Sequence, residues 1–266
     1  RCSTREVERA IEAVKNNETT MLQRTQDFKM RPEQKEAVTK TADYFESFAA
    51  DKSNEGLTAH FLWNAKMRFG KTFTAYQLAL RMKWKHVLVL TFKPAVKTAW
   101  KEDLLTHKDF KGWTFVEKQE NREFNHVDLS QRFVCFASFQ DVLGTNSVGG
   151  IKATNEWIQQ VHWDCIILDE YHFGAWGKNA KEYYNKQDIA TRIAEETQNI
   201  YAEDAASKKE MEARETFDEG LMPLKTRHYL YLSGTPFRAI ASGEFIEEQI
   251  YNWTYSDEQR AKENWV

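Results

Sequence analysis

A short apolar segment that runs directly into Gly-Lys-Thr constrains the fold of this chain more than any other feature. Residues 60–63 (His-Phe-Leu-Trp) precede residues 65–72 (Ala-Lys-Met-Arg-Phe-Gly-Lys-Thr), and a helix-prone stretch follows at residues 73–81. A buried strand, a tight loop and a helix in this order can hold phosphate groups, because the loop amides and the positive end of the helix dipole face the anion. The pattern predicts a phosphate-binding loop. An ordinary helix start is the alternative, since Ala65 stands where such loops usually have their first glycine.

Each polar position of the loop suits one part of a nucleoside triphosphate. Gly70 lets the backbone approach the phosphates closely, and Lys71 brings a positive charge to the β- and γ-phosphates. The hydroxyl of Thr72 can ligate Mg²⁺. The loop therefore predicts a nucleotide and a magnesium ion as ligands.

An acidic pair follows a second apolar run. Residues 164–168 have the composition of a strand that is buried on both faces, and Asp169 and Glu170 come directly after it. Ligands of parallel sheets bind at the carboxyl ends of the strands. Asp169 can hold Mg²⁺ there, and Glu170 can orient or deprotonate an attacking water. The alternative for such a pair is a solvated loop start or a helix cap.

Composition excludes several classes of protein. The chain has 266 residues, 41% of them hydrophobic, which is enough for a large α/β domain with a real core. The net charge of −3 provides no global basic field, so a nucleic-acid partner must use a local patch. No apolar run approaches the ~20 residues of a membrane span, and the three cysteines have no zinc spacing. We expect a cytoplasmic protein with no membrane partner, and the opening Arg1 indicates an excised fragment.

Strand-like and helix-like segments alternate along most of the chain. Further strands are predicted at residues 87–91, 114–116, 133–137, 165–168 and 229–232, and helices at residues 37–48, 95–105 and 155–160. Such alternation favours a mainly parallel sheet with helices on both faces.

Four segments describe the expected organisation. Residues 1–27 form a helical arm, residues 28–244 form the nucleotide-binding domain, and residues 245–266 form an aromatic-rich tail that leads towards a further domain. Residues 178–220 are strongly charged and have no strand-like run, so they predict a helical insertion. A solvated helical hairpin is the simpler interpretation of the insertion, and a partner-binding element is the alternative.

A third pattern links these features to a known family. Residues 229–237 form a strand that ends in Ser-Gly-Thr-Pro, after the phosphate loop and an Asp-Glu-x-His. This order resembles the first RecA-like domain of superfamily 2 helicases and translocases. Six segments match that family in order, at residues 31–34, 67–72, 91–94, 137–140, 169–172 and 233–235. Their spelling is most similar to motor subunits of restriction–modification systems and to related bacterial and phage helicases.

The resemblance implies a RecA-like fold, ATP and Mg²⁺ as cofactors, and a role for each matched residue. The implied catalytic residues are Lys71, Asp169 and Glu170, and the implied metal ligands are Thr72 and Asp169. The implied nucleotide-binding residues are Arg31, Gln34, Arg68, Gly70, Lys71 and Thr72, with Gln34 at the position that reads adenine. Coupling between sites is implied for His172, Ser233 and Thr235, and nucleic-acid contacts for Lys93, Lys97, Ser138 and Gln140. Arg68 departs from the family, because many members have glycine at that position.

The family pattern also includes a second RecA-like domain with an arginine-rich motif, Gln-x-x-Gly-Arg-x-x-Arg. This motif does not occur in the 266 residues. We therefore expect the ATP-binding half of a motor that acts on nucleic acid, DNA rather than RNA. A nucleotide-binding switch or scaffold, which binds protein partners through the insertion, is the alternative.

Overall fold

The computed structural model describes seven parts of the chain: residues 24–91, 94–117, 128–138, 142, 156–169, 224–234 and 245–263. The predicted insertion at residues 178–220 and most of the predicted arm lie outside them. Residues 24–31 are not helical, and Gln26 forms a parallel bridge with His107. None of the helices in the described parts is long and apolar enough to cross a bilayer.

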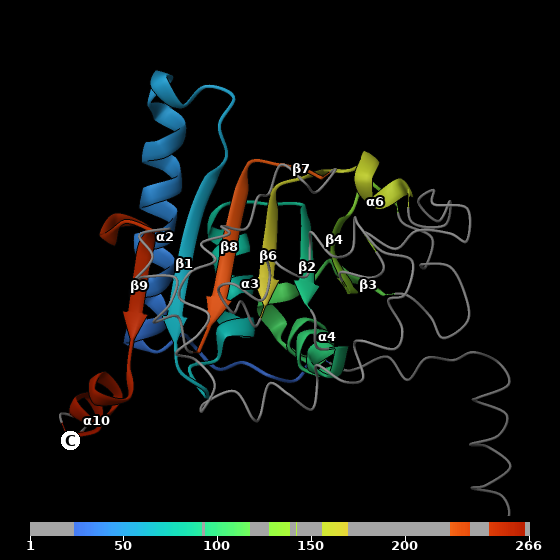
Figure 1. The fold of residues 1–266 in the computed structure, drawn as a ribbon. Helices are drawn as coiled ribbons and strands as arrows, with labels where there is room; N and C mark the ends of the chain where they lie inside the picture. The colour runs from blue at the N-terminus through green and yellow to red at the C-terminus, as the bar shows by residue number, and fades with distance from the viewer. Residues whose placement is uncertain are drawn as a thin grey trace, which may run out of the picture.

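A seven-stranded sheet runs through the centre of the molecule, and every pairing in it is parallel (Figure 1). Its order is β3-β4-β2-β6-β8-β1-β9. The strands are β1 (Ala59–Ala65), β2 (His86–Thr91), β3 (Trp113–Glu117), β4 (Arg132–Ser138), β6 (Cys165–Asp169), β8 (His228–Ser233) and β9 (Ile250–Trp253). A separate two-stranded pair contains β5 (His162–Trp163) and β7 (Lys225–Thr226). The prediction of a parallel sheet is confirmed, as are all six predicted strands.

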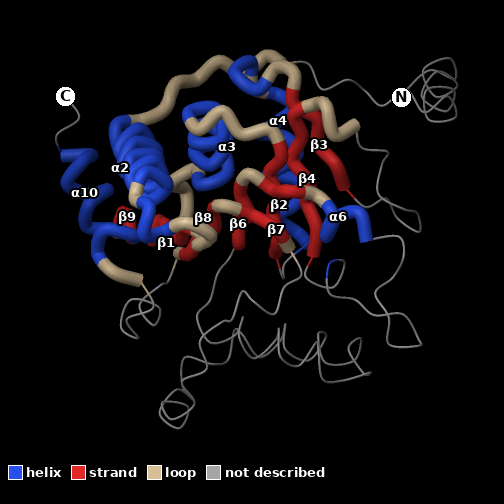
Figure 2. Tube along the Cα trace, turned by 90° about the horizontal axis from the view of Figure 1, so that it is seen from above, coloured by secondary structure: helices blue, strands red, loops and turns tan. Residues whose placement is uncertain are grey.

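Three helices cover one face of the sheet. Figure 2 shows α2 (Pro32–Ala50), α3 (Lys71–Arg81) and α4 (Lys97–Thr106) side by side along this face. The short helix α6 (Glu156–Gln160) contributes Ile158 to the core of the opposite face. The described part of the chain also contains short 3₁₀ helices at η1 (Lys52–Asn54), η2 (Pro94–Val96), η3 (Lys108–Phe110) and η7 (Glu247–Gln249).

The central strands are buried on both faces, which explains their nearly continuous apolar sequences. In β2, Val87 and Val89 belong to the core beneath α2, α3 and α4, whereas Leu88 and Leu90 belong to the core on the other face. All four side chains are fully buried. Side chains alternate between faces in a strand, so a strand covered on both sides needs apolar residues at every position.

The sheet continues past the domain boundary that we expected at residue 244. Residues Ile250–Trp253 form the edge strand β9, which pairs in parallel with β1, for example Leu62 with Ile250. The helix α10 (Tyr255–Glu263) follows it. Part of the predicted tail therefore belongs to the sheet. A strand of four residues that includes the polar Asn252 is too short to show a clear period-2 pattern.

Candidate functional site

A row of polar residues marks the carboxyl edge of the sheet. Thr91 at the end of β2 is in register with Ser138 of β4 on one side and with Asp169 of β6 on the other. On the far side of β8, Asn64 of β1 is in register with Ser233. Ligands of parallel sheets bind just beyond these strand ends. The structure therefore brings the predicted residues Ser138, Asp169 and Ser233 to one edge, next to the end of the strand that leads into the phosphate loop.

The phosphate loop leads from β1 into α3. Gly70 caps the helix with a φ of 82°, and α3 begins at Lys71, so Thr72 lies in the first helical turn. The Lys71 Nζ donates a hydrogen bond of 2.7 Å to the carbonyl oxygen of Ala65. The ammonium group is thus held over the loop that starts at Ala65, in front of the amino end of an 11-residue helix. This arrangement combines a fixed positive charge with the N–H groups of a helix start, and it suits an anionic ligand.

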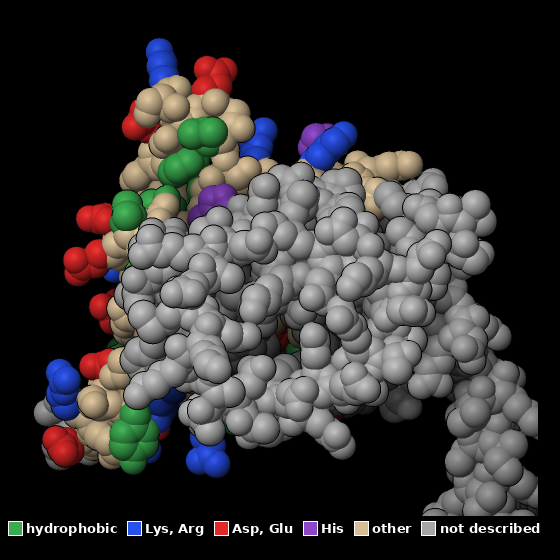
Figure 3. All heavy atoms as spheres, viewed as in Figure 1, with side chains coloured by type: hydrophobic (Ala, Val, Ile, Leu, Met, Phe, Trp, Pro, Cys, Tyr) green, Lys and Arg blue, Asp and Glu red, His purple; other side chains and the backbone are tan. Residues whose placement is uncertain are grey.

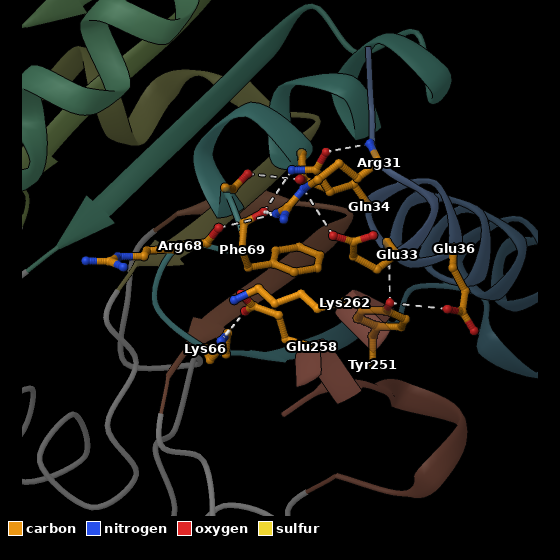
Figure 4. A network of polar contacts seen from close by, with 12 residues as sticks. Arg31, Glu33, Gln34, Glu36, Lys66, Arg68, Phe69, Tyr251, Glu258 and Lys262 are labelled. Atoms are coloured by element: carbon orange, nitrogen blue, oxygen red, sulfur yellow. Dashed lines mark hydrogen bonds and ion pairs between the residues drawn. The ribbon is translucent and has the colours of Figure 1, made fainter. Parts of the chain in front are cut away.

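The segment predicted to read adenine holds the loop from the α2 side (Figure 4). The Gln34 Nε2 donates to the carbonyl oxygen of Phe69 at 2.8 Å, and its Oε1 accepts from the Arg31 backbone N–H at 2.9 Å. The Arg31 guanidinium donates to the same Phe69 oxygen at 2.6 Å and pairs with Glu33 at 3.0 Å. Two side chains from the start of α2 thus converge on one carbonyl of the loop. The structure brings Arg31 and Gln34 together with the phosphate loop, and their contact with a nucleotide stays a prediction.

Arg68 occupies a conformation that glycine adopts more readily. Its φ is 70°, in the left-handed region, where an L residue costs about 1–2 kcal/mol. Its carbonyl oxygen accepts from the Arg31 guanidinium at 3.3 Å, while its own guanidinium points away from that network in Figure 4. Many family members have glycine at this position, and glycine adopts a positive φ without strain. Arg68 lies 37 residues after Arg31 in the sequence. Its side chain takes no part in the hydrogen bonds that Arg31 and Gln34 donate to the Phe69 carbonyl oxygen.

The chain that follows β9 holds the other side of the loop. The Lys66 backbone N–H donates to the Trp253 carbonyl at 3.2 Å, and the Lys66 ammonium forms an ion pair with Glu258. The same ammonium lies 4.8 Å from the centre of the Tyr255 ring, and Lys262 also pairs with Glu258, at 3.0 Å (Figure 4). Hydrogen bonds from these lysines lower the pKa of Glu258 to about 2. Figure 3 shows both acidic and basic side chains exposed at the lower left of the molecule, where Figure 1 places α10.

Asp169 is 6% exposed at the end of β6. Its Oδ2 accepts a hydrogen bond of 2.7 Å from the indole Nε1 of Trp100, a buried residue of α4. Sequence reasoning did not single out Trp100, because its apolar position on a helix was sufficient explanation for it. Within the described residues no group of three or more His, Cys, Asp or Glu side chains forms a metal cluster. A single carboxylate is adequate for Mg²⁺, which is usually bound by one or two carboxylates together with substrate phosphates.

One predicted nucleic-acid contact, Lys97, is engaged in an ion pair. Lys97 is the first residue of α4, and its Nζ lies 3.0 Å from the Glu117 carboxylate at the end of β3. Lys101, one turn further along α4, pairs with the other oxygen of Glu117. Burial alone would raise the pKa of Glu117, but the hydrogen bonds and charges of the two lysines together lower it below its ordinary value. Sequence reasoning missed Glu117 and Lys101, which form a charged cluster with Lys97. Glu117 is in register with Phe136 of β4, two residues before Ser138.

Several predicted site residues lie outside the described part of the chain. They are Glu170, His172, Thr235, Lys93 and Gln140. Ser233 is buried at the end of β8, and a β-carbon at the adjacent Gly234 would lie 4.0 Å from the Ala65 carbonyl oxygen. Gly234 therefore lies beside the phosphate loop, and the coupling roles of His172, Ser233 and Thr235 stay predictions.

Comparison with known proteins identifies a matching family, a similar relative and a similar solved structure. The family described as "Type III restriction enzyme, res subunit" matches residues 27–238. The protein "Putative type II restriction enzyme and methyltransferase RM.MpnORF110P C-terminus" of Mycoplasma pneumoniae is 33% identical in an alignment of length 213 that covers 76% of this chain. The chain spans only 29% of that relative's length. A nuclease-deletion mutant of the Type ISP restriction-modification enzyme LlaGI, solved with a DNA substrate mimic, has a TM-score of 0.48 and 16% identity, over 90% of this chain and 21% of that one.

Proposed function

Since this chain belongs to the type III restriction enzyme res subunit family, a superfamily 2 helicase-like family with a RecA-like domain, we propose that it is the ATP-binding half of a DNA-dependent motor. In this proposal ATP binds with Mg²⁺ at the carboxyl edge of the sheet. Lys71 contacts the β- and γ-phosphates, and Thr72 and Asp169 hold the metal. Arg31, Gln34, Arg68 and Gly70 complete the nucleotide site, and Gln34 contacts adenine.

The observation that carries the proposal is the position of Asp169 relative to the phosphate loop. Strand β8 lies between β1 and β6, and all three strands are parallel, so the loop after β1 and Asp169 after β6 share one edge of the sheet. Asp169 would hold Mg²⁺ at this edge beside a bound triphosphate, and the metal would supply positive charge to neutralise the charge that develops on the phosphates. Glu170, in the next position of the chain, would orient the attacking water.

The proposed partners of this chain are DNA and a further domain of a longer polypeptide. The relative in Mycoplasma pneumoniae carries the name of a restriction enzyme and methyltransferase, and both of those activities act on DNA. The chain covers 29% of that relative, which supports further domains in a longer polypeptide, and we propose that one of them is a second RecA-like domain. Lys93, Lys97, Ser138 and Gln140 would contact the DNA backbone without reading sequence. His172, Ser233 and Thr235 would couple the nucleotide site to that contact.

The second candidate is a nucleotide-binding switch or scaffold that binds proteins through residues 178–220. It shares the nucleotide site but not the second domain. The two candidates differ in whether the sequence that continues after residue 266 encodes a second RecA-like domain with an arginine-rich motif.

Calorimetric titration with ATP tests the shared part of both candidates. We expect the chain to bind ATP with Mg²⁺, and Lys71→Ala to weaken binding by about 1.5–3 kcal/mol, since it removes charge-assisted contacts. Asp169→Asn should reduce the gain in affinity that Mg²⁺ provides. Lys52→Ala removes an exposed lysine of η1 and serves as the control for a loss of one charge. Equal ATP affinities for the wild type and Lys71→Ala would overturn the assignment of the loop.

A further inference from the structure

Trp100 makes a contact that its role in the core does not require. Its side chain is 1% exposed, and its Nε1–H donates to Oδ2 of Asp169 at 2.7 Å. The two residues are 69 positions apart and come from α4 and β6. A buried indole N–H needs an acceptor, but a backbone carbonyl is sufficient, as the bond of Trp163 to the Ile158 carbonyl at 2.9 Å shows. Trp100 instead donates to the carboxylate at the carboxyl edge of the sheet.

Helix α3, which begins at Lys71, contacts Trp100 and holds its indole ring in place. The Tyr76 hydroxyl on α3 donates to the Trp100 carbonyl oxygen at 2.8 Å, and the two rings meet edge to face at 5.3 Å. Tyr76 is 1% exposed, and burial, followed by the negative charges of Asp103 and Asp169, raises the pKa of its hydroxyl. Tyr76 therefore stays a neutral donor. The chain of contacts from α3 through Trp100 to Asp169 fixes the indole relative to the phosphate-binding helix.

A neutral donor has a specific advantage beside a carboxylate that binds a metal. An indole N–H can only donate, and it carries no charge. It takes one of the roughly four acceptor positions of an ionised carboxylate and fixes the rotation of the group. A lysine or arginine in the same place would fix it as well, but it would also supply the positive charge that a divalent cation otherwise provides. Trp100 can thus orient Asp169 and leave its negative charge for a cation.

We propose that Trp100 is a positioning residue that sets the Asp169 carboxylate for Mg²⁺ in the nucleotide complex. This inference rests on the proposed function of Asp169 as a metal ligand. Partners that orient metal ligands typically contribute 10- to 100-fold to metal affinity or activity, since they fix the ligand in its binding geometry. Trp100 therefore determines how strongly Mg²⁺ tightens nucleotide binding, and it has no direct part in binding the nucleotide itself.

The test compares Trp100→Phe with Trp163→Phe by calorimetry. Both variants replace a buried indole with a phenyl ring and remove one hydrogen bond, but Trp163 lies in the core on the opposite face, and its N–H is bonded to a backbone carbonyl. A non-hydrolysable ATP analogue is titrated with EDTA and over a series of Mg²⁺ concentrations. For Trp100→Phe we expect affinity in EDTA to stay at the wild-type value, and the Mg²⁺ concentration at half-effect to rise about 10- to 100-fold. Trp163→Phe should match the wild type in both measurements.

Three outcomes separate this inference from the proposed function. If the wild type does not bind the analogue, or binds it without any effect of Mg²⁺, the proposed function fails. If the wild type depends on Mg²⁺ and Trp100→Phe has the same dependence, the positioning role of Trp100 is overturned. If Trp100→Phe does not fold, ¹⁵N-labelled indoles of the folded wild type provide the readout. The indole signal that Asp169→Asn shifts should also move when Mg²⁺ and the analogue are added to the wild type, and an unmoved signal would contradict the inference.

Discussion

Gln34 and Gly70 lie so close together that a β-carbon at residue 70 would sit 2.8 Å from the Gln34 Nε2. The same amide nitrogen donates to the Phe69 carbonyl, so it cannot withdraw without loss of the bond that holds the loop. Gly70 also has a φ of 82°, which an L residue adopts only with strain. Two independent requirements, close contact and backbone conformation, therefore meet at this one glycine.

Gly70→Ala should lower the free energy of unfolding by about 2–3 kcal/mol, the sum of left-handed strain and the forced displacement of the Gln34 amide. Gln34→Ala removes the clash but not the strain. In the double variant the cost of alanine at residue 70 should fall to about 1–2 kcal/mol. Urea unfolding of the wild type, both single variants and the double variant gives this coupling. Strictly additive effects would mean that the two residues do not contact each other in solution.

A half-buried carboxyl on α4, that of Asp103, predicts how stability changes with pH. Burial, with a smaller contribution from Glu102, raises the pKa of Asp103 to about 6. The folded state therefore binds a proton that the unfolded chain has already released between about pH 4 and pH 6, and stability falls as pH rises through this range. Above pH 6 the ionised carboxyl is a constant cost.

Asp103→Asn removes that cost. It should leave stability nearly unchanged at pH 4 and increase it by about 1 kcal/mol at pH 7, after allowance for solvent screening of a partly exposed group. Chemical unfolding at pH 4, 5, 6 and 7 measures the change. Asp43→Asn, at an exposed position of α2, is the control and should show no growing difference with pH. A gain for Asp103→Asn that is the same at every pH would contradict the assignment of the titrating group.

The sequence was most informative where a pattern repeats or where chemistry restricts the residue type. Strands β1, β2, β4, β6 and β8 are nearly continuous apolar runs because both faces of the sheet are covered there, so they could be predicted. The edge strand β3 could be predicted from its apolar residues, although Thr114 within it is exposed. Gly70 and Lys71 could be predicted because a phosphate loop needs those types at that spacing. The edge strand β9 could not be predicted, since its four residues, which include the polar Asn252, are too few to show a clear period-2 pattern.

The supporting residues of the site were beyond sequence reasoning for a related reason. Trp100 has the sequence pattern of any core residue on a helix, and only the packing of α4 against β6 shows that its N–H reaches Asp169. Glu117 is similar, because its pairing with Lys97 and Lys101 connects β3 to α4. Such contacts join segments whose spacing follows no motif. Motifs in the sequence indicate candidate ligand-binding groups, but they do not indicate the groups that hold those candidates in place.

The pairing of Glu117 with two lysines predicts a variant that binds DNA more tightly. Glu117→Gln should free Lys97 and Lys101 for phosphate contacts. An exposed ion pair is worth about 0.2–1 kcal/mol, so DNA affinity should rise by about 1.5- to 5-fold for each lysine released. Because phosphate contacts release counterions, the gain should shrink with added salt. Fluorescence anisotropy with a labelled duplex at 50 and 200 mM salt measures both effects.

Glu102→Gln is the matched control, since it removes the same charge from an exposed position of α4. An equal gain in both variants would show a general effect of net charge instead of the release of these two lysines. No gain in either variant would remove the predicted Lys97 contact from the proposed DNA-binding surface.

ATP turnover by the 266-residue chain should be very slow, even with DNA present. Hydrolysis needs a metal on bridged phosphates, a placed water, and positive charge near the γ-phosphate. Lys71, Thr72 and Asp169 can supply the first, and Glu170 the second. In the proposed motor the third comes from arginines of a second RecA-like domain, and such an arginine is worth ~10³–10⁵ in rate where it has been documented.

Phosphate release, measured with and without DNA, should therefore rise by about 10³-fold or more when the polypeptide is extended through the next domain. Glu170→Gln in the longer polypeptide should abolish the gain, which ties the activity to this site. Arg68 is the one arginine of the loop, so it is the local residue that could replace an arginine of the second domain, although its guanidinium points away from the Arg31 network in Figure 4. If the 266-residue chain alone shows DNA-stimulated turnover that is lost in Glu170→Gln, the need for a second domain is refuted. Loss of that turnover in Arg68→Gly would then assign the positive charge to Arg68, since glycine suits the φ of 70° at this position and leaves the loop backbone unstrained.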